Sequence, residues 1–215
     1  DCAVRGPLMT GSRVVGVSTD KGDFYADLVI DACGMRSPVR ENLPLCVPID
    51  KTVNRLDRIT IYRAFYDRAD MQEVRDKFKV VLFADGIRGI SWIATEGQYT
   101  DLLIGRFADF DLAEVDRFAG LLRQTNPQLG RKVLRGGQFV EIPVRQPLAV
   151  MVWNGYAAIG DSAFMTVPLI GSGIANSLRA ARFLADTVLA DTYGRFDCET
   201  LWPYAVSYTH LTLPT

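Results

Sequence analysis

Histidine is almost absent from this chain of 215 residues: the single one, His210, lies within the last ten residues. Those residues, VSYTHLTLPT, resemble the translation of a sequencing-library adapter, so we predict that residues 206–215 are a non-native tail and exclude them from the fold. The rest of the chain then contains no histidine, which excludes His-based catalytic triads and His metal sites. A bound cofactor is therefore the expected source of chemistry.

Cysteine is also scarce, and its positions show neither CxxC spacing nor histidine partners: Cys2, Cys33, Cys46 and Cys198. This pattern argues against zinc and iron–sulfur centres, so no metal is expected. The simplest interpretation is four reduced, buried cysteines in a cytoplasmic protein.

Long apolar runs and a strong net charge are missing too. No apolar stretch approaches the roughly 20 residues that a transmembrane helix needs, although peripheral contact with a membrane stays open. The formal net charge of −1 gives no indication of nucleic-acid binding. The sequence does not predict an oligomeric state.

The dinucleotide-binding pattern GxGxxG occurs nowhere in the chain, which begins at Asp1 rather than Met. The first expected strand, Arg13–Val17, has no predicted element before it with which to pair. We therefore expect a fragment whose N-terminal part is missing.

The most informative segment begins as an apolar strand over residues 156–159 and continues into Gly160-Asp161. A loop with Pro168 follows, then Gly171-Ser172-Gly173, and a helix is predicted from Ile174. Its apolar stripe is expected at intervals of three and four residues: Ile174, Leu178, Ala181, Ala185, Val188 and Leu189.

Glycines at a helix start expose backbone N–H groups, which favour negative charge together with the helix dipole. A lone Asp at a strand end suits hydrogen bonds from sugar or ribityl hydroxyls. The two motifs in this order favour a flavin nucleotide. The alternative for each motif alone is an ordinary surface turn and an ordinary helix N-cap.

A second cluster starts with an apolar strand over residues 27–31 and ends in the small residues Cys33 and Gly34. Small residues at a strand end leave room for a nucleotide. Arg36 and Arg40 follow and are candidates for facing a pyrophosphate. The alternative is a buried strand with a basic surface turn.

Together the two clusters, ACGMRSPVR and GDSAFMTVPLIGSGI, resemble the FAD-binding motifs of the geranylgeranyl reductase and flavin monooxygenase superfamily. Cys33 stands where the aromatic hydroxylases usually have Asp, which is more similar to the reductase and halogenase branches. The stretch 136–143 also resembles the reductase branch, and residues 89–93 lie where that branch has an aromatic strand over the flavin.

The resemblance implies an α/β (α+β) fold: a partial Rossmann-like FAD-binding domain with an inserted antiparallel-sheet substrate domain. The expected boundaries are 1–48 and 149–205 for the two parts of the FAD-binding domain, 49–148 for the inserted sheet, and 206–215 for the tail. It also implies that FAD contacts Cys33, Gly34, Arg36, Gly160, Asp161, Pro168, Gly171, Ser172, Gly173 and Ile174.

The middle of the chain agrees with an antiparallel sheet, because strand patterns follow one another with a single helix among them. That helix is predicted to begin at Asp111 with a capping box to Glu114. Its expected apolar stripe is Leu112, Val115, Phe118, Ala119 and Leu122.

Substrate-binding residues are harder to predict. Trp92 and Phe65 lie on predicted strands and are candidates for a hydrophobic pocket, with plain core packing as the alternative. Arg131, Lys132 and Arg135 form a basic group, either a contact for a nicotinamide-nucleotide phosphate or a solvated turn.

Three functions stay open. The first is an FAD-dependent reductase or dehydrogenase of the geranylgeranyl reductase type that acts on a hydrophobic small molecule, with NAD(P)H as a candidate electron donor. The second is an FAD- and NAD(P)H-dependent aromatic monooxygenase. The third is a nucleotide-binding or interaction protein without catalysis. No side chain is singled out as catalytic.

Overall fold

The computed structural model describes residues 1–83, 88–167 and 171–212. It divides into two compact units, which we call the terminal unit, Asp1–Asp57 with Pro143–Thr215, and the sheet unit, Arg58–Ile142. The sheet unit therefore begins at Arg58 rather than at residue 49 and ends at Ile142 rather than at 148. The reason is burial: Ile49 and Leu148 pack into the core of the terminal unit.

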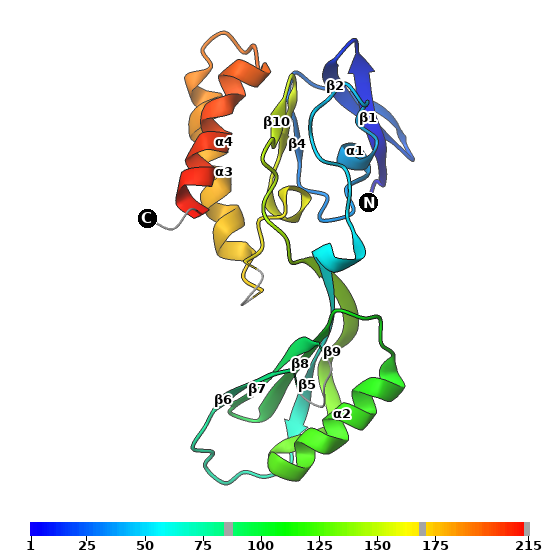
Figure 1. Ribbon diagram of the computed structural model, residues 1–215, viewed down its shortest axis with the longest axis vertical. Helices are drawn as coiled ribbons and strands as arrows, with labels where there is room; N and C mark the ends of the chain where they lie inside the picture. The colour runs from blue at the N-terminus through cyan, green and yellow to red at the C-terminus, as the bar shows by residue number, and fades with distance from the viewer. Residues whose placement is uncertain (84–87, 168–170, 213–215) are drawn as a thin grey trace. The chain divides into compact units, whose positions relative to one another are not determined.

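Two small sheets build the terminal unit (Figure 1). The first has the order β1-β2-β3, and the second has the order β10-β11-β4 with β11 and β4 parallel. Their bounds are β1 Val4–Thr10, β2 Arg13–Thr19, β3 Gly22–Tyr25, β4 Val29–Asp31, β10 Val152–Trp153 and β11 Tyr156–Ala158.

Strand β1 corrects the expectation that the first predicted strand has no partner. It pairs with β2 in antiparallel fashion, from Val4 opposite Thr19 to Thr10 opposite Arg13. Gly6 and Pro7 interrupt the apolar alternation of β1, which conceals it in the sequence. The register shifts that accompany them are typical of a β-bulge.

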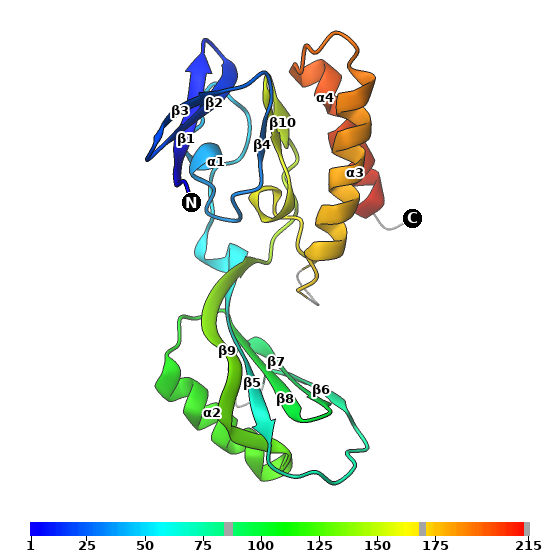
Figure 2. The same cartoon turned by 180° about the vertical axis from the view of Figure 1, so that it is seen from behind.

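Two long helices cover one side of the β10-β11-β4 sheet, and they lie side by side in both views (Figures 1 and 2). They are α3, Ile174–Ala190, and α4, Cys198–Thr212. Helix α4 therefore continues into the segment that we excluded from the fold. Tyr208 of that segment is buried, and its hydroxyl donates to the carbonyl of Met165 at 3.4 Å.

The buried side of α3 is not the one predicted. Ile174, Leu178 and Leu189 are 81%, 68% and 80% exposed, whereas the residues that pack inward are Ala180, Leu184 and Thr187. The side with Ser177 and Ala180 packs inward, because its small side chains permit close approach to the turn at Gly160.

The sheet unit is a five-stranded sheet in the order β6-β7-β8-β5-β9, which confirms the expected antiparallel sheet. Helix α2, Leu112–Thr125, lies along one of its faces (Figure 2). The strands are β5 Arg58–Arg68, β6 Phe78–Leu82, β7 Gly89–Glu96, β8 Tyr99–Arg106 and β9 Leu129–Pro143.

Helix α2 begins as the sequence predicts, since the Asp111 carboxylate accepts the backbone N–H of Glu114 at 2.9 Å. Its buried residues are Val115, Phe118, Ala119 and Leu122. Leu112 is exposed instead, although its spacing places it on the stripe, because it is the first residue of the helix.

Parallel strands β4 and β11 are tied together by the buried carboxylate of Asp31, the last residue of β4. One oxygen accepts the hydroxyls of Ser37 at 2.5 Å and Tyr156 at 2.7 Å, and the other accepts the backbone N–H of Cys33 at 3.0 Å. Burial, followed by the charge of Asp31, raises the pKa of Tyr156, so this phenol stays a hydrogen-bond donor.

The same region holds a fully buried arginine, Arg40, in the short helix α1, Pro38–Glu41. Its guanidinium donates to the carbonyls of Met35 and Ser162 and stacks on Phe164 with 4.5 Å to the ring centroid. Arg40 therefore joins the segment after β4 to the segment after β11 and is not available to a pyrophosphate, contrary to the interpretation from sequence.

We expect Asp31→Ala to lower the free energy of unfolding of the terminal unit by about 3–5 kcal/mol. The substitution leaves two buried hydroxyls and one N–H without their acceptor. Urea unfolding measures this loss. Asp27→Ala, at an exposed position just before the same strand, is the matched control and should cost less than about 0.5 kcal/mol. Equal effects of the two substitutions would contradict the role of Asp31.

Candidate functional site

The predicted cofactor residues gather at the carboxyl ends of two neighbouring parallel strands. Ala158 of β11 lies opposite Asp31 of β4, and the backbone N–H of Ile159 donates to the Asp31 carbonyl at 2.9 Å. The segment from Cys33 to Arg36 leaves the end of β4, and Gly160-Asp161 leaves the end of β11. This is the edge at which open α/β sheets bind ligands.

Gly160 starts a turn of 3-10 helix, Gly160–Ala163, that directs the chain away from β11. Its φ of +66° favours glycine, and a Cβ there would lie 3.3 Å from the Ser177 hydroxyl of α3. The Ser162 hydroxyl donates to the Asp31 carbonyl and fixes the turn against β4. Gly160 is therefore needed where the turn and α3 approach each other.

Asp161 lies beside the glycines at the start of α3. Its Oδ1 accepts the Thr166 hydroxyl at 2.5 Å, and a Cβ on Gly173 would lie 2.7 Å from that hydroxyl and 3.5 Å from Asp161 Oδ1. The backbone N–H of Val167 donates to the Ser172 carbonyl at 3.0 Å and closes the loop between them. Pro168 is outside the described residues.

The N-terminus of α3 is not capped by a side chain. Its N-cap is Gly173, and its first turn contains no acidic residue. The first N–H groups of a helix have no partner within the helix, and they carry partial positive charge. Gly171, with φ +60°, and Ile174 are exposed next to them.

This donor set fits the acceptor edge of a flavin, and Asp161 supplies an acceptor for hydroxyl groups nearby. Two side chains that position the set had no signal in the sequence. They are Thr166, which bonds Asp161, and Asn176, whose amide donates to the Met165 carbonyl at 3.1 Å. Hydroxyl and amide side chains that act through tertiary contacts form no motif.

The segment after β4 leaves open space at its surface. A Cβ on Gly34 would meet nothing within 4 Å, and its φ is +83°. Cys33 and Arg36 are exposed. The space next to Gly34 is therefore open, and a ligand against Cys33-Gly34 stays a prediction.

The cysteines are not buried as expected: Cys2, Cys33 and Cys46 are exposed, and Cys198 is intermediate. Each lies in a loop or at the start of a helix rather than in a core strand. Partial burial and then the carboxylate of Asp31 raise the pKa of Cys33 to about 11. The Cys33 thiol is therefore protonated at neutral pH and a poor nucleophile.

Trp92 and Phe65 lie in the sheet unit, on the face opposite α2, and both are partly exposed. Neither belongs to the buried cluster beneath α2, which consists mainly of residues such as Tyr62, Ile93 and Leu102. Plain core packing does not describe them.

The basic residues 131–135 are not one turn. They lie along β9, where Arg131 lines a hollow with Asp116 and Arg123 of α2 and Arg135 stacks on Phe65, which faces away from α2. Arg131 therefore lies toward α2 whereas the Arg135 guanidinium lies over Phe65, so the two side chains do not form one basic group.

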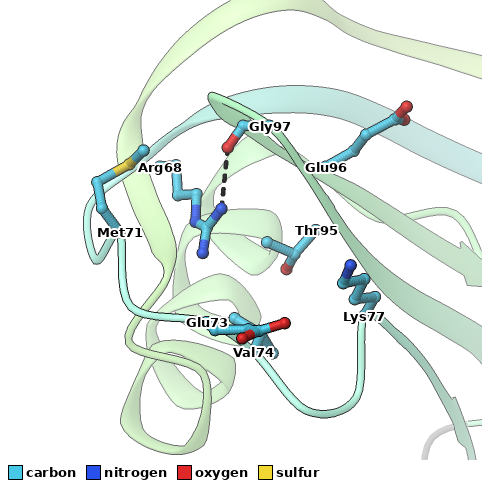
Figure 3. A pocket seen from close by; sticks show the side chains of 8 residues that line it. All are labelled: Arg68, Met71, Glu73, Val74, Lys77, Thr95, Glu96 and Gly97. Atoms are coloured by element: carbon cyan, nitrogen blue, oxygen red, sulfur yellow. Dashed lines mark hydrogen bonds between the residues drawn. The ribbon is translucent and has the colours of Figure 1, made fainter.

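A pocket of about 320 Å³ lies at one end of the sheet unit, around Arg68 and Thr95 (Figure 3). The Arg68 guanidinium donates to the carbonyls of Asp70, Gln72 and Gly97. It thereby anchors the segment that follows β5. Because the guanidinium nitrogens of Arg68 already donate to these carbonyls, we interpret the pocket as structural.

Comparison with known proteins gives a consistent result, although no protein-family model matches. The chain is 25% identical over 216 residues to digeranylgeranylglycerophospholipid reductase of Sulfolobus acidocaldarius, covering 98% of this chain and 46% of that protein. The protein of that name in Haloferax volcanii is 28% identical over 208 residues, covering 87% and 48%. The chain thus spans about half the length of these curated relatives.

A solved structure supports the same fold. The geranylgeranyl bacteriochlorophyll reductase-like protein of Thermoplasma acidophilum superimposes with a TM-score of 0.79 at 18% identity, covering 98% of this chain and 54% of that chain. Parallel strand ends, the Gly-Asp turn and the α3 start define the class of FAD-binding α/β folds with an antiparallel sheet. The sequence of the chain is similar to those of the two reductases named above, and its fold is similar to that of the Thermoplasma protein.

Within residues 1–83, 88–167 and 171–212, no helix is long and apolar enough to cross a membrane. The same part of the chain contains no group of three metal-ligating side chains.

We expect the alkylation of Cys33 by iodoacetamide at pH 8 to be about tenfold slower than that of a free thiol of pKa 9.0. The raised pKa lowers the thiolate fraction about 100-fold, and the higher nucleophilicity of a more basic thiolate recovers about tenfold. Mass spectrometry of the Cys33 peptide against N-acetylcysteine measures the ratio. An alkylation rate that rises to a plateau below pH 9 would contradict the assignment.

Proposed function

We propose that the protein is an FAD-dependent oxidoreductase of the geranylgeranyl reductase type, acting on a hydrophobic substrate. The observation that carries this proposal is the helix N-terminus of α3, which has no side-chain cap and lies beside the hydrogen-bonded pair Thr166–Asp161. The motif order in the sequence and the relatives of similar sequence support it.

When bound, FAD would supply the hydride chemistry, and the residues of this chain would bind and orient it. The backbone N–H groups from Gly171 to Ile174 would donate to the flavin edge on which negative charge develops. A helix terminus stabilises a nearby charge by about 0.3–1 kcal/mol, and by more when partly buried. That contribution requires no acidic or basic side chain.

Asp161 would accept hydrogen bonds from ribityl hydroxyls, since only one of its oxygens is engaged by Thr166. Cys33 and Gly34 would lie against the cofactor because nothing occupies the space next to Gly34. Arg36, exposed beside them, would face the pyrophosphate.

The relatives' names specify a prenylated glycerophospholipid, which makes a prenyl chain the first substrate class to test. Trp92 and Phe65 would contact that chain, because both are aromatic and accessible on the face of the sheet that α2 leaves open. NAD(P)H remains a proposed electron donor.

We expect Gly171→Val to abolish flavin binding. Valine is strained at a φ of +60° and would fill the space in front of the α3 N–H groups. Gly11→Val is the matched control, since Gly11 has a φ of +58° in the β1–β2 turn and its Cβ would meet nothing within 4 Å. Visible flavin absorbance per protein, after incubation with FAD, measures occupancy. Full occupancy in Gly171→Val, or equal loss in both variants, would contradict the placement.

The activity itself is tested anaerobically, with chemically reduced, FAD-loaded protein and geranylgeranylated glycerophospholipid. The expected result is flavin reoxidation with saturation of prenyl double bonds, detected by mass spectrometry as a gain of two hydrogens per bond. Reoxidation that requires oxygen and hydroxylates an aromatic substrate would establish the monooxygenase alternative. A protein that never acquires flavin absorbance would overturn both in favour of a role without catalysis.

A further inference from the structure

The face of the sheet opposite α2, which we call the open face, is composed of alternate residues of β5, β6, β7 and β8. Tyr62, Ala64 and Tyr66 of β5 pack toward α2, so Arg63 and Phe65 between them point to the open face. Residues directly opposite each other on paired strands share a face, so the strand registers extend the open face across the sheet. Phe65 lies opposite Asp101, and Trp92 lies opposite both Val80 and Leu103. Strand order and register thus define one continuous surface.

The polarity of the open face changes across the strands. Its β6 edge is apolar, with Phe78, Val80 and Leu82 all about half exposed. Trp92 of β7 continues this surface, with its ring centroid 6.1 Å from that of Phe78. Apolar side chains that stay exposed side by side are typical of a surface that binds an apolar ligand.

The opposite half of the open face carries arginines on aromatic rings. Arg63 lies 5.2 Å from the Phe65 ring centroid and 5.8 Å from that of Trp92. Its charge is compensated, because Nε and Nη2 donate to the two carboxylate oxygens of Asp101 at 3.0 and 2.7 Å. Arg63 is therefore held rigidly by a bidentate pair.

Arg135 of β9 differs from Arg63 in having no carboxylate partner among the described residues. Its guanidinium lies over Phe65, 3.9 Å from the ring centroid. The carboxylates nearby are engaged elsewhere: Asp101 accepts from Arg63, and Glu96 accepts the Tyr99 hydroxyl at 2.8 Å. The stacking fixes the plane of the guanidinium and leaves its N–H edge for an anion.

We propose that Arg135 is a specificity-determining residue that binds the phosphate of an amphiphilic prenyl phosphate ester. The apolar chain then lies across Trp92 toward Phe78, Val80 and Leu82, over four strand spacings or about 19 Å. This orientation follows from the polarity of the face, with the cation at β9 and the apolar edge at β6. The inference rests on the proposed function for the type of chain, and it adds the contact for the head group.

Binding is measured with three probes on the FAD-incubated protein below the micellar concentration: geranylgeranyl phosphate, geranylgeraniol and inorganic phosphate. Isothermal titration calorimetry reports each affinity. We expect geranylgeranyl phosphate to bind about tenfold or more tightly than the alcohol, since one charge-assisted hydrogen-bonded contact is worth at least that factor. Inorganic phosphate alone should bind far more weakly than both.

Arg135→Gln should reduce the affinity for geranylgeranyl phosphate to that for geranylgeraniol and leave the alcohol unaffected. Arg131→Gln is the matched control, because Arg131 is an arginine of the same strand on the side that faces α2. Val80→Asn should weaken both prenyl probes equally. Unchanged phosphate discrimination in Arg135→Gln, or an equal loss in Arg131→Gln, would overturn the proposal.

The flavin content of the same samples separates this proposal from the proposed function. Protein that carries FAD but binds the phosphate and the alcohol equally refutes only the role of Arg135. Protein without FAD that still shows discrimination dependent on Arg135 supports the head-group contact and refutes the oxidoreductase.

Discussion

The parallel pairing of β4 with β11, fixed by the buried carboxylate of Asp31, is the constraint on which the candidate site depends. Residues 31 and 156 are far apart in the sequence, yet the Tyr156 hydroxyl donates to Asp31 at 2.7 Å. The carbonyl of Asp31 also accepts the Ile159 N–H and the Ser162 hydroxyl. One residue thus sets the register of two strands and the start of both loops that leave them.

Helices α2 and α3 differ at their N-termini, because α2 has a side-chain cap and α3 has none. Helix α2 is capped by Asp111, as expected where nothing but folding is required. Helix α3 begins at Gly173 without a side-chain cap, which costs about a few tenths of a kcal/mol relative to an Asp or Ser at that position. The N–H groups at the start of α3 thus have no side-chain acceptor beside Asp161, which is the basis for proposing the cofactor site there.

The sequence predicts what depends on local pattern and misses what depends on tertiary contacts. Apolar segments bounded by Gly and charged residues reveal β5, β7 and β8, and the capping box reveals α2, because both signals lie within a few residues. The prediction of which side of α3 is buried was wrong, because the contact with the turn at Gly160 selects the side with Ser177 and Ala180, and that contact leaves no local pattern. Arg40 was misplaced because no pattern shows that two backbone carbonyls and Phe164 enclose a guanidinium.

Exposed aromatic side chains on the sheet unit pose a solubility problem that the arginines resolve. A bare row of Phe78, Trp92, Phe65 and Tyr99 would favour association between copies. Arg63 of β5 and Arg135 of the neighbouring strand β9 both stack on Phe65. The ring therefore stays at the surface with charged, hydrated groups beside it. With Arg135 stacked on Phe65, the rings left for a ligand are those of Trp92 and Phe78. The aromatic surface therefore remains available to a ligand without being buried permanently in the fold.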